Sequence, residues 1–290
     1  MGKAAPPVTV GIPVFNGERF LPEALASART QTFADLEILI SDNGSTDATE
    51  EICRAATRED GRIRYMRHEV NRGGVWNFNN LVAHARGRYF KWAAADDVML
   101  PRFIETCTEA VDDPGVVLSY PRTRVIDAEG TVTEDLNDAH LRGDCPTPHQ
   151  RLEEFLAAQA AHLIYGLFQV SVLRTTRGMR PTIGNDVVLL TEMACRGRFA
   201  LVPERLFLQR RHSQQFSAQG ADQVSFHAPL KNARFDLPQT KVSVELLRGV
   251  ASSPIGAREK RLCVAAVTRS WTIPRWRGPA GDVRRLLLGH

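Results

Sequence analysis

Clustered cysteines are missing from this sequence, and their absence excludes two kinds of site. Its 290 residues hold five cysteines without any Cys-x-x-Cys pair, at Cys53, Cys107, Cys145, Cys195 and Cys263. Disulfide frameworks and zinc sites both need cysteines at short, paired spacings. We therefore expect free thiols in a reducing compartment, and hence a cytoplasmic protein.

Long apolar runs and a strong excess of one charge are missing as well. The N-terminal Met-Gly-Lys-Ala-Ala-Pro-Pro has no apolar signal core, and the longest apolar stretch, residues 163–173, is too short to span a bilayer. The formal net charge of +4 is too mild to indicate a nucleic-acid-binding protein, so no nucleic-acid partner is expected.

What the sequence does contain is an alternation of strand-like and helix-like segments. Four apolar runs are typical of buried strands, and three amphipathic segments lie between them. The strands are expected at residues 8–13, 36–41, 63–67 and 89–95, and the helices at residues 21–28, 48–58 and 75–85. This order predicts an α/β fold with a parallel sheet and right-handed crossovers. The first crossover has no Gly-x-Gly-x-x-Gly, so a dinucleotide-binding dehydrogenase is poorly supported.

Each predicted strand is followed by a polar cluster, where ligands bind in open α/β sheets. The clusters are Phe15-Asn16-Gly17-Glu18, Asp42-Asn43, Asn71-Arg72-Gly73 and Asp96-Asp97. Asp42 could accept a hydrogen bond from a base or a ribose, or it could stabilise an Asx-turn. Arg72 could hold a phosphate or be a solvated surface arginine.

Two adjacent carboxylates, Asp96 and Asp97, end the strand at residues 89–95. They would repel each other unless a cation lies between them and a ligand. A divalent cation that bridges them to a diphosphate would remove this cost. The alternative is a helix cap, because Pro101 stands where a helix could begin and acids favour that end.

Taken together, these segments resemble a family 2 glycosyltransferase with the nucleotide-diphospho-sugar transferase (GT-A) fold. The resemblance rests on four pieces: Val10-Gly11-Ile12-Pro13-Val14-Phe15-Asn16, residues 38–47 (Ile-Leu-Ile-Ser-Asp-Asn-Gly-Ser-Thr-Asp), Asn71-Arg72-Gly73, and Gly87-Arg88-Tyr89 with Ala95-Asp96-Asp97. It implies a Rossmann-like, mixed but mainly parallel sheet flanked by helices. The resemblance stops at residue 214, and the C-terminal tail beyond it is expected to be helical from its own residues, at 240–249 and 257–269.

The resemblance also implies roles for the strand-end residues. Asp42 would bind the nucleotide base, and the segment from Pro13 to Glu18 would wrap the nucleoside. Asp96 and Asp97 stand at the metal motif, whose strictest form places an acid at Ala95. We therefore expect Asp97 to ligate Mg²⁺ or Mn²⁺ and Asp96 to contact a sugar or ribose. The full set expected to bind the nucleotide sugar is Pro13, Phe15, Asn16, Glu18, Asp42, Asn43, Arg72, Gly73 and Asp96.

A second acidic stretch, Asn185-Asp186, precedes an apolar helix expected at residues 187–195. Asp186 could be the N-cap of that helix. The resemblance instead implies a general base, although the family has Glu-Asp where this chain has Asn185-Asp186. It further implies that His212 completes the metal shell or touches the diphosphate. Arg210 and Arg211 could meet the diphosphate charge or be solvated.

We expect a glycosyltransferase domain at residues 1–215, with a nucleotide-binding half (1–100) and an acceptor half (101–215). Residues 131–150 are expected to form a loop on the acceptor side, and residues 216–290 a helical extension. Residues 271–277 and 284–288 mix basic, aromatic and aliphatic side chains. That mixture suits peripheral contact with anionic lipid at the inner face of the membrane. A tail packed on the domain or a homodimer interface would explain it equally well.

The expected function is therefore that of an inverting, metal-dependent hexosyltransferase in polysaccharide or glycoconjugate biosynthesis. The donor would be a nucleotide-diphosphate sugar, with UDP-sugars favoured and dTDP-sugars next. The acceptor could be a glycan, a lipid-linked sugar or a small molecule. The alternative is a non-catalytic nucleotide-sugar-binding partner subunit, which the neutral Ala95 and Asn185 keep open.

Overall fold

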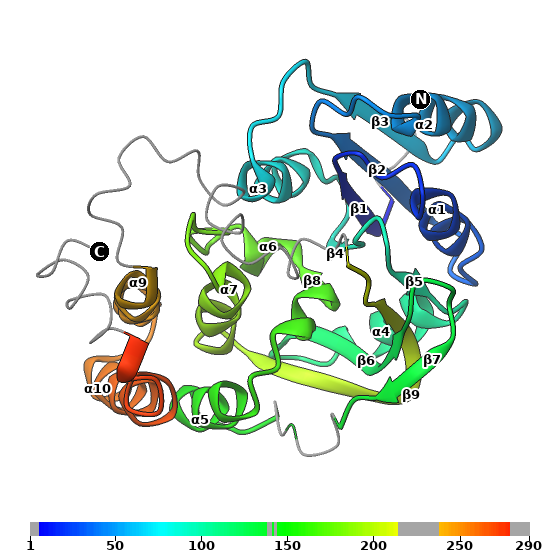
Figure 1. Ribbon diagram of the computed structural model, residues 1–290. Helices are drawn as coiled ribbons and strands as arrows, with labels where there is room; N and C mark the ends of the chain where they lie inside the picture. The colour runs from blue at the N-terminus through cyan, green and yellow to red at the C-terminus, as the bar shows by residue number, and fades with distance from the viewer. Residues whose placement is uncertain (1–5, 138–140, 142–143, 214–237, 279–290) are drawn as a thin grey trace, which may run out of the picture.

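The computed structural model describes residues 6–137, 141, 144–213 and 238–278, and has a mixed nine-stranded sheet flanked by helices (Figure 1). The strands follow the order β3-β2-β1-β4-β8-β6-β9-β5, and β7 pairs with β6. None of the helices in these ranges is long and apolar enough to cross a membrane.

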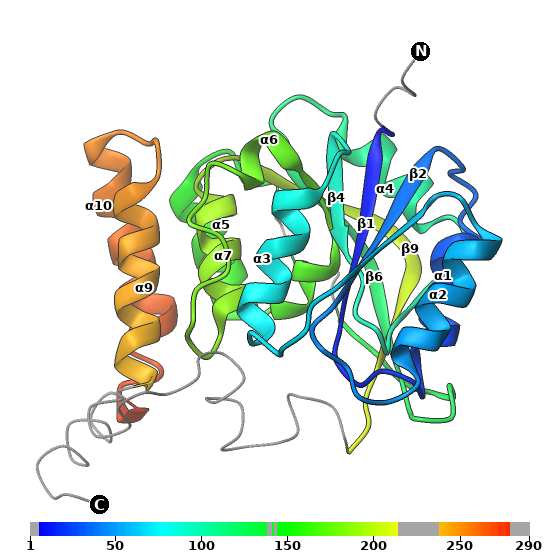
Figure 2. The ribbon, with the colours of Figure 1, turned by 90° about the horizontal axis from the view of Figure 1, so that it is seen from above.

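The first half of the chain forms the parallel part of the sheet, as predicted. Its strands are β1 (Val8–Val14), β2 (Leu36–Asp42), β3 (Ile63–Arg67) and β4 (Tyr89–Trp92), and its helices are α1 (Leu21–Arg29), α2 (Thr49–Glu59) and α3 (Gly74–His84). β1 pairs in parallel with both β2 and β4, and β2 with β3. Figure 2 shows α1 and α2 on one side of these strands and α3 on the other. The carboxyl ends of all four strands therefore meet at one edge.

The second half adds the mixed part of the sheet. Its strands are β5 (Val98–Met99), β6 (Val116–Ile126), β7 (Val132–Asp135), β8 (Leu167–Gln169) and β9 (Arg198–Arg210). β8 runs antiparallel to β4 and β6, and β9 runs parallel to β6. Its helices are α4 (Phe103–Val111), α5 (Pro148–Ala158), the 3-10 helix η1 (Ala161–Tyr165), α6 (Val170–Leu173) and α7 (Asn185–Ala194).

Two strands of the second half continue through a proline. Residues 116–126 and 198–210 each form one long strand, the first containing Pro121 and the second Pro203. Bulges between β6 and β9 at Pro121, Arg122 and Thr123 absorb the irregularity without ending the pairing. The predicted loop at residues 131–150 also contains β7 and the start of α5.

The capping alternative for the Asp96-Asp97 pair is wrong, and neither Ser45 nor Thr46 is the N-cap of α2. The N-cap of α2 is Ala48, and the side chain of Asp47 accepts the hydrogen bond from the Thr49 N–H. The strand β4 ends at Trp92, earlier than predicted, and β5 lies between the acids and α4. Since the N-cap of α4 is Arg102, neither acid caps that helix.

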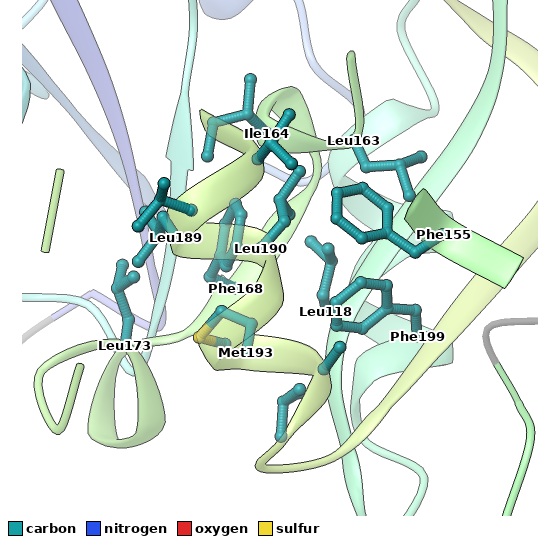
Figure 3. Close-up of a cluster of buried hydrophobic side chains, with 14 of the residues drawn as sticks. Leu118, Phe155, Leu163, Ile164, Phe168, Leu173, Leu189, Leu190, Met193 and Phe199 are labelled. Atoms are coloured by element: carbon teal, nitrogen blue, oxygen red, sulfur yellow. The ribbon is translucent and has the colours of Figure 1, made fainter. Parts of the chain in front are cut away.

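The core of the second half fixes α7 and η1 in place. Figure 3 shows side chains of α7, among them Leu189 and Leu190, directed toward Ile164 of η1 and Phe168 of β8. All four side chains are buried. The first turn of α7 and the end of η1 are therefore anchored to the same core.

The C-terminal helices share this core. α9 (Pro238–Ser252) and α10 (Ala257–Val267), which continues into the π-helix η4 (Thr268–Thr272), stand side by side next to α5 and α7 (Figure 2). Leu246 and Ala266 belong to the same buried cluster as Leu190. The described part of the predicted extension, residues 238–278, is thus helical and packed on the domain, and the boundary expected at residues 215–216 lies outside the described residues.

Candidate active site

The loops that follow β1 and β2 are tied together by side chains predicted to bind nucleotide. The side-chain oxygen of Asn16 accepts a hydrogen bond from the Thr46 N–H at 2.9 Å, and Glu18 accepts one from the Ala48 N–H at 2.9 Å. Asn16 has a φ of 51°, which aims its side chain at the second loop. Phe15 is left 43% exposed at this edge, as a flat apolar surface on which a base could stack.

Asp42 ends β2 in a fully buried position, beside Pro13 and Val14 of β1. One carboxylate oxygen accepts from the Ser45 N–H at 2.9 Å, and the other accepts from the Tyr65 hydroxyl at 2.7 Å. Burial and this carboxylate raise the pKa of Tyr65, so the phenol stays a donor. The expected Asx-turn is present. A carboxylate has about four acceptor positions, and the bonds from Ser45 and Tyr65 use two of them. Binding of a nucleotide base by Asp42 is compatible with the Asx-turn and stays a prediction.

Asn43 and Arg72 have different surroundings at the loop that precedes α3. Buried Asn43 donates to Asn71 at 2.8 Å and accepts from the Arg72 N–H at 3.0 Å, and so holds the loop before α3. The exposed Arg72 guanidinium lies 4.7 Å from the centre of the Trp76 ring and forms no salt bridge with any described carboxylate. Gly73, with a φ of 88°, needs to be glycine for this turn. Arg72 is thus placed to meet a phosphate.

Asp97 is held inside the protein. It is 5% exposed, and its Oδ1 accepts a hydrogen bond from the Arg210 N–H at 2.8 Å. The ammonium of fully buried Lys91 donates to the Trp92 carbonyl, and burial lowers its pKa to about 7. Burial and neighbouring Asp96 raise the pKa of Asp97 well above its usual range, although Arg210 and Lys91 oppose this.

Asp96 and His212 form the more accessible pair. The Asp96 side chain is 23% exposed, and its Oδ2 lies 3.1 Å from His212 Nε2. The other ring nitrogen of His212 is buried without a hydrogen-bond partner in the described part of the chain. The exposure therefore favours Asp96 over Asp97 as the carboxylate that faces a ligand. The roles of metal ligand for Asp97 and of sugar or ribose contact for Asp96 stay predictions.

The two arginines before His212 are already engaged. Arg210 is 1% exposed, and its guanidinium binds Glu23 of α1 and the carbonyls of Asp96 and Asp127. Arg211 pairs with Glu134 of β7 at 2.9 Å. The Arg210 side chain is buried and joins β9 to α1 and to two loops. It is therefore neither solvated nor free to bind a diphosphate.

The residues around Asp96 suit a divalent metal only in company with other ligands. No cluster of three or more His, Cys, Asp or Glu side chains that could hold a metal occurs within the described ranges. Carboxylates and a histidine nitrogen are ligands that Mg²⁺ or Mn²⁺ accepts, and His212 has an orphaned buried nitrogen. Asp96, His212 and Asp97 do not form such a cluster as they stand, so a metal at this place would need most of its ligands from a bound diphosphate.

Asp186 occupies the first turn of α7 and does not cap it. The N-cap is Gly184, with a φ of 64°, which corrects the capping alternative. One Asp186 oxygen accepts from the Val187 N–H at 2.7 Å, and Asp186 forms no salt bridge with any described cation. Burial raises the pKa of this carboxyl group. An unpaired carboxylate with a raised pKa suits proton abstraction.

Tyr165 shows that the acids from distant segments come together. Burial and then Asp97, Asp96 and Asp186 all act to raise the pKa of its phenol well above the usual range. The acids predicted from residues 96–97 and 186 therefore share one neighbourhood. The sequence analysis did not identify Tyr165 or Lys91, and the only signal for either was a polar group within an otherwise apolar stretch.

Comparison with known proteins gives a family for most of this region. Residues 9–176 match the family described as Glycosyl transferase family 2, which is more than half of the chain. A GalNAc(5)-diNAcBac-PP-undecaprenol beta-1,3-glucosyltransferase of Campylobacter jejuni is 26% identical over 185 residues, covering 63% of this chain and 58% of that protein. Chondroitin synthase of Escherichia coli is 28% identical over 186 residues, which cover 64% of this chain and 26% of that protein. The chain thus spans well under two thirds of these relatives.

Solved structures share the fold at low sequence identity. S. aureus TarS 1-349 in complex with UDP-GlcNAc matches with a TM-score of 0.68 and 13% identity, over 93% of this chain and 74% of that one. Mannosyltransferase PcManGT from Pyrobaculum calidifontis, in complex with GDP-Man and Mn²⁺, matches with a TM-score of 0.58 and 16% identity, over 98% and 76%. The GT-A-type fold expected from the sequence is thereby confirmed.

Proposed function

The chain belongs to glycosyl transferase family 2, and from this we propose that it transfers a sugar from a nucleotide-diphosphate donor to an acceptor hydroxyl with inversion at the anomeric carbon. One observation carries the proposal: Asp96, Asp97 and Asp186, from separate segments, act on the single phenol of Tyr165. Inverting transfer needs a base beside the acceptor and a positive charge beside the leaving diphosphate, which carboxylates can provide by holding a cation; acids from two separate segments near one residue support this proposal.

Asp186 is the proposed general base. Its carboxylate takes the proton from the acceptor hydroxyl as that oxygen attacks the anomeric carbon from the face opposite the diphosphate. A positioned base typically contributes roughly 10²–10⁴-fold in rate. The transition state has oxocarbenium character, as in glycoside hydrolysis, and no second carboxylate is needed as a nucleophile.

The leaving diphosphate lies on the other side of the site. Arg72 offers an unpaired guanidinium to it, and Asp96 with His212 faces the same edge. A bound Mg²⁺ or Mn²⁺ held by Asp96, His212 and Asp97 would neutralise the charge that develops on the departing phosphate. In this proposal the nucleotide base of the donor stacks near Phe15 and hydrogen-bonds to Asp42 at the end of β2.

The comparisons support the class of donor. Structural neighbours hold UDP-GlcNAc, UDP or GDP-Man, which supports a nucleotide-sugar donor. The preference for UDP-sugars, with dTDP-sugars next, remains the expectation from the sequence. The named relatives act on a lipid-linked oligosaccharide or make a polysaccharide. A glycan or lipid-linked acceptor is therefore favoured over a small molecule.

The C-terminal helices offer a surface for a membrane. Residues 257–278 contain six basic residues and one acid, Glu259, which is bound to His149 at 2.7 Å. Ile273 and Trp276 are 60% and 61% exposed at the end of this segment. Basic and aromatic side chains together suit an anionic lipid surface. A homodimer interface is the competing use of the same face.

A non-catalytic nucleotide-sugar-binding subunit is the alternative function, because Ala95 and Asn185 replace acids of the family motif. The test is a thermal-shift screen of UDP, dTDP and GDP with Mn²⁺, followed by turnover of the matching nucleotide sugar. A ligand that binds only the folded state raises the melting temperature. Stabilisation with donor hydrolysis or transfer supports the enzyme; stabilisation without any turnover favours the binding subunit.

A further inference from the structure

Tyr165 lies between the two segments that carry the acids. It is the last residue of η1, which contacts both α7 and β4. The next strand, β8, begins at Leu167 and pairs it with Lys91, so the chain at Tyr165 runs beside the carboxyl end of β4. Asp96 follows that end of β4, and Asp186 opens α7.

The position of Tyr165 is fixed from both sides. Leu163 and Ile164, the two residues before it, are buried in the core that also holds Leu190 of α7 (Figure 3). The Tyr165 ring packs against Phe207 of β9, with 5.6 Å between ring centres. A ring held in this way is an ordered surface, since the packing leaves it little freedom.

The hydroxyl of Tyr165 is the polar group of this side chain. It makes no hydrogen bond with any residue the structure describes, and it is not among the atoms sealed from solvent. Burial and the three nearby carboxylates keep the phenol protonated. A protonated phenol has one hydrogen to donate, and no oxygen of the described residues receives it.

We propose that Tyr165 contacts the donor substrate and donates a hydrogen bond from its hydroxyl to the sugar being transferred. The inference rests on the proposed function. The anomeric carbon is bonded to the diphosphate near Asp96 and is attacked by an oxygen held at Asp186. The transferred sugar therefore fills the space between those two carboxylates, and Tyr165 lies in that space.

The test measures how much the sugar adds to donor affinity. Calorimetry with Mn²⁺ compares UDP with UDP-GlcNAc, or GDP with GDP-mannose if the guanine nucleotide is the one that stabilises the wild-type protein. We expect Tyr165→Phe to bind the nucleoside diphosphate as wild type does and to bind the nucleotide sugar roughly tenfold more weakly, the effect of one lost hydrogen bond.

A matched control is Tyr89→Phe, which removes a hydroxyl bonded to Asp112 at the start of β4, the end of that strand opposite to the one followed by Asp96. It should leave both affinities unchanged. Equal affinity of Tyr165→Phe and wild type for the nucleotide sugar would overturn the inference, as would equal weakening of both ligands. If the wild-type protein binds neither pair, the proposed function itself fails, and this inference fails with it.

Discussion

At the scale of single residues, the setting of Asp186 predicts how the rate changes with pH. Burial raises the pKa of its carboxyl group, and only the deprotonated form can accept a proton from the acceptor. The rate should therefore fall as pH drops through this raised pKa, at a higher pH than an ordinary aspartate near 3.9 would give. The measurement is kcat/KM for transfer against pH. An acid limb in the range of an unperturbed aspartate would contradict the assignment.

Asp96 yields a second residue-scale prediction, about metal-dependent binding. Asp96→Asn removes the charge that faces the ligand beside His212, so the calorimetric affinity for UDP should fall by roughly tenfold or more with Mn²⁺ present. The loss should be small without the metal. Asp113→Asn, at a surface carboxylate paired with Arg198, is the control and should change neither affinity. An unchanged Mn²⁺-dependent affinity for Asp96→Asn would remove Asp96 from the metal site.

At the scale of elements, one buried ion network joins α9 to α7. Arg177 binds Glu192 of α7 at 2.7 Å and Glu245 of α9 at 2.8 Å, and both carboxylates are buried. Arg177→Leu would remove the cation that both buried carboxylates share, and would leave Glu192 with Arg196 at 3.9 Å and Glu245 with Arg180 and Arg248. The free energy of unfolding should fall by about 3 kcal/mol, with Tm about 5–10 °C lower.

The control for this network is Arg269→Leu. Arg269 pairs with Glu153 in an exposed salt bridge, whose loss should cost under about 1 kcal/mol. Denaturant unfolding of the two variants makes the comparison. Similar losses for Arg177→Leu and Arg269→Leu would show that the helical segment is not held to the domain by this network.

The elements of the first half could be predicted because each is determined locally. β1, β2 and β3 are apolar runs that end in polar clusters, and the helices between them have buried apolar faces. The second half depends on distant partners. β6 continues past Pro121 only because β9 pairs along it, and β5 exists only because Leu208 and Phe207 pair with it. No local pattern contains that information.

The same difference separates the site residues that were foreseen from those that were not. Asp42, Asp96, Asp97 and Asp186 follow recognisable segments, so the sequence identified them. The burial that distinguishes Asp97 from Asp96 comes from Arg210, more than a hundred residues away. Since neighbouring acids look alike in sequence, the direction in which each one faces could not be predicted.

At the scale of the whole molecule, the basic C-terminal face lies close to the proposed base. Val242 of α9 lies next to Gly184, two residues before Asp186, and Gln239 lies next to Gly278 at the end of the helical segment. A membrane that docks on this end would bring a lipid-linked acceptor near the base.

Flotation with vesicles that contain anionic lipid tests this docking. Trp276→Ser should weaken binding severalfold, because Trp276 is 61% exposed and would lose its contact with lipid. Val132→Ser, at a valine of β7 that is 49% exposed, is the control and should bind as wild type does. Binding that is unaffected by Trp276→Ser, together with a dimer that this change dissociates, would assign the face to a second copy of the chain.

The most direct test of the account is the turnover of Asp186→Asn. The substitution keeps the size of the side chain but removes the base, while the nucleotide and metal sites are untouched. We predict donor affinity within about twofold of wild type and a transfer rate lower by roughly 10²-fold or more. Transfer at the wild-type rate by Asp186→Asn would contradict the central claim that this carboxylate takes the acceptor proton.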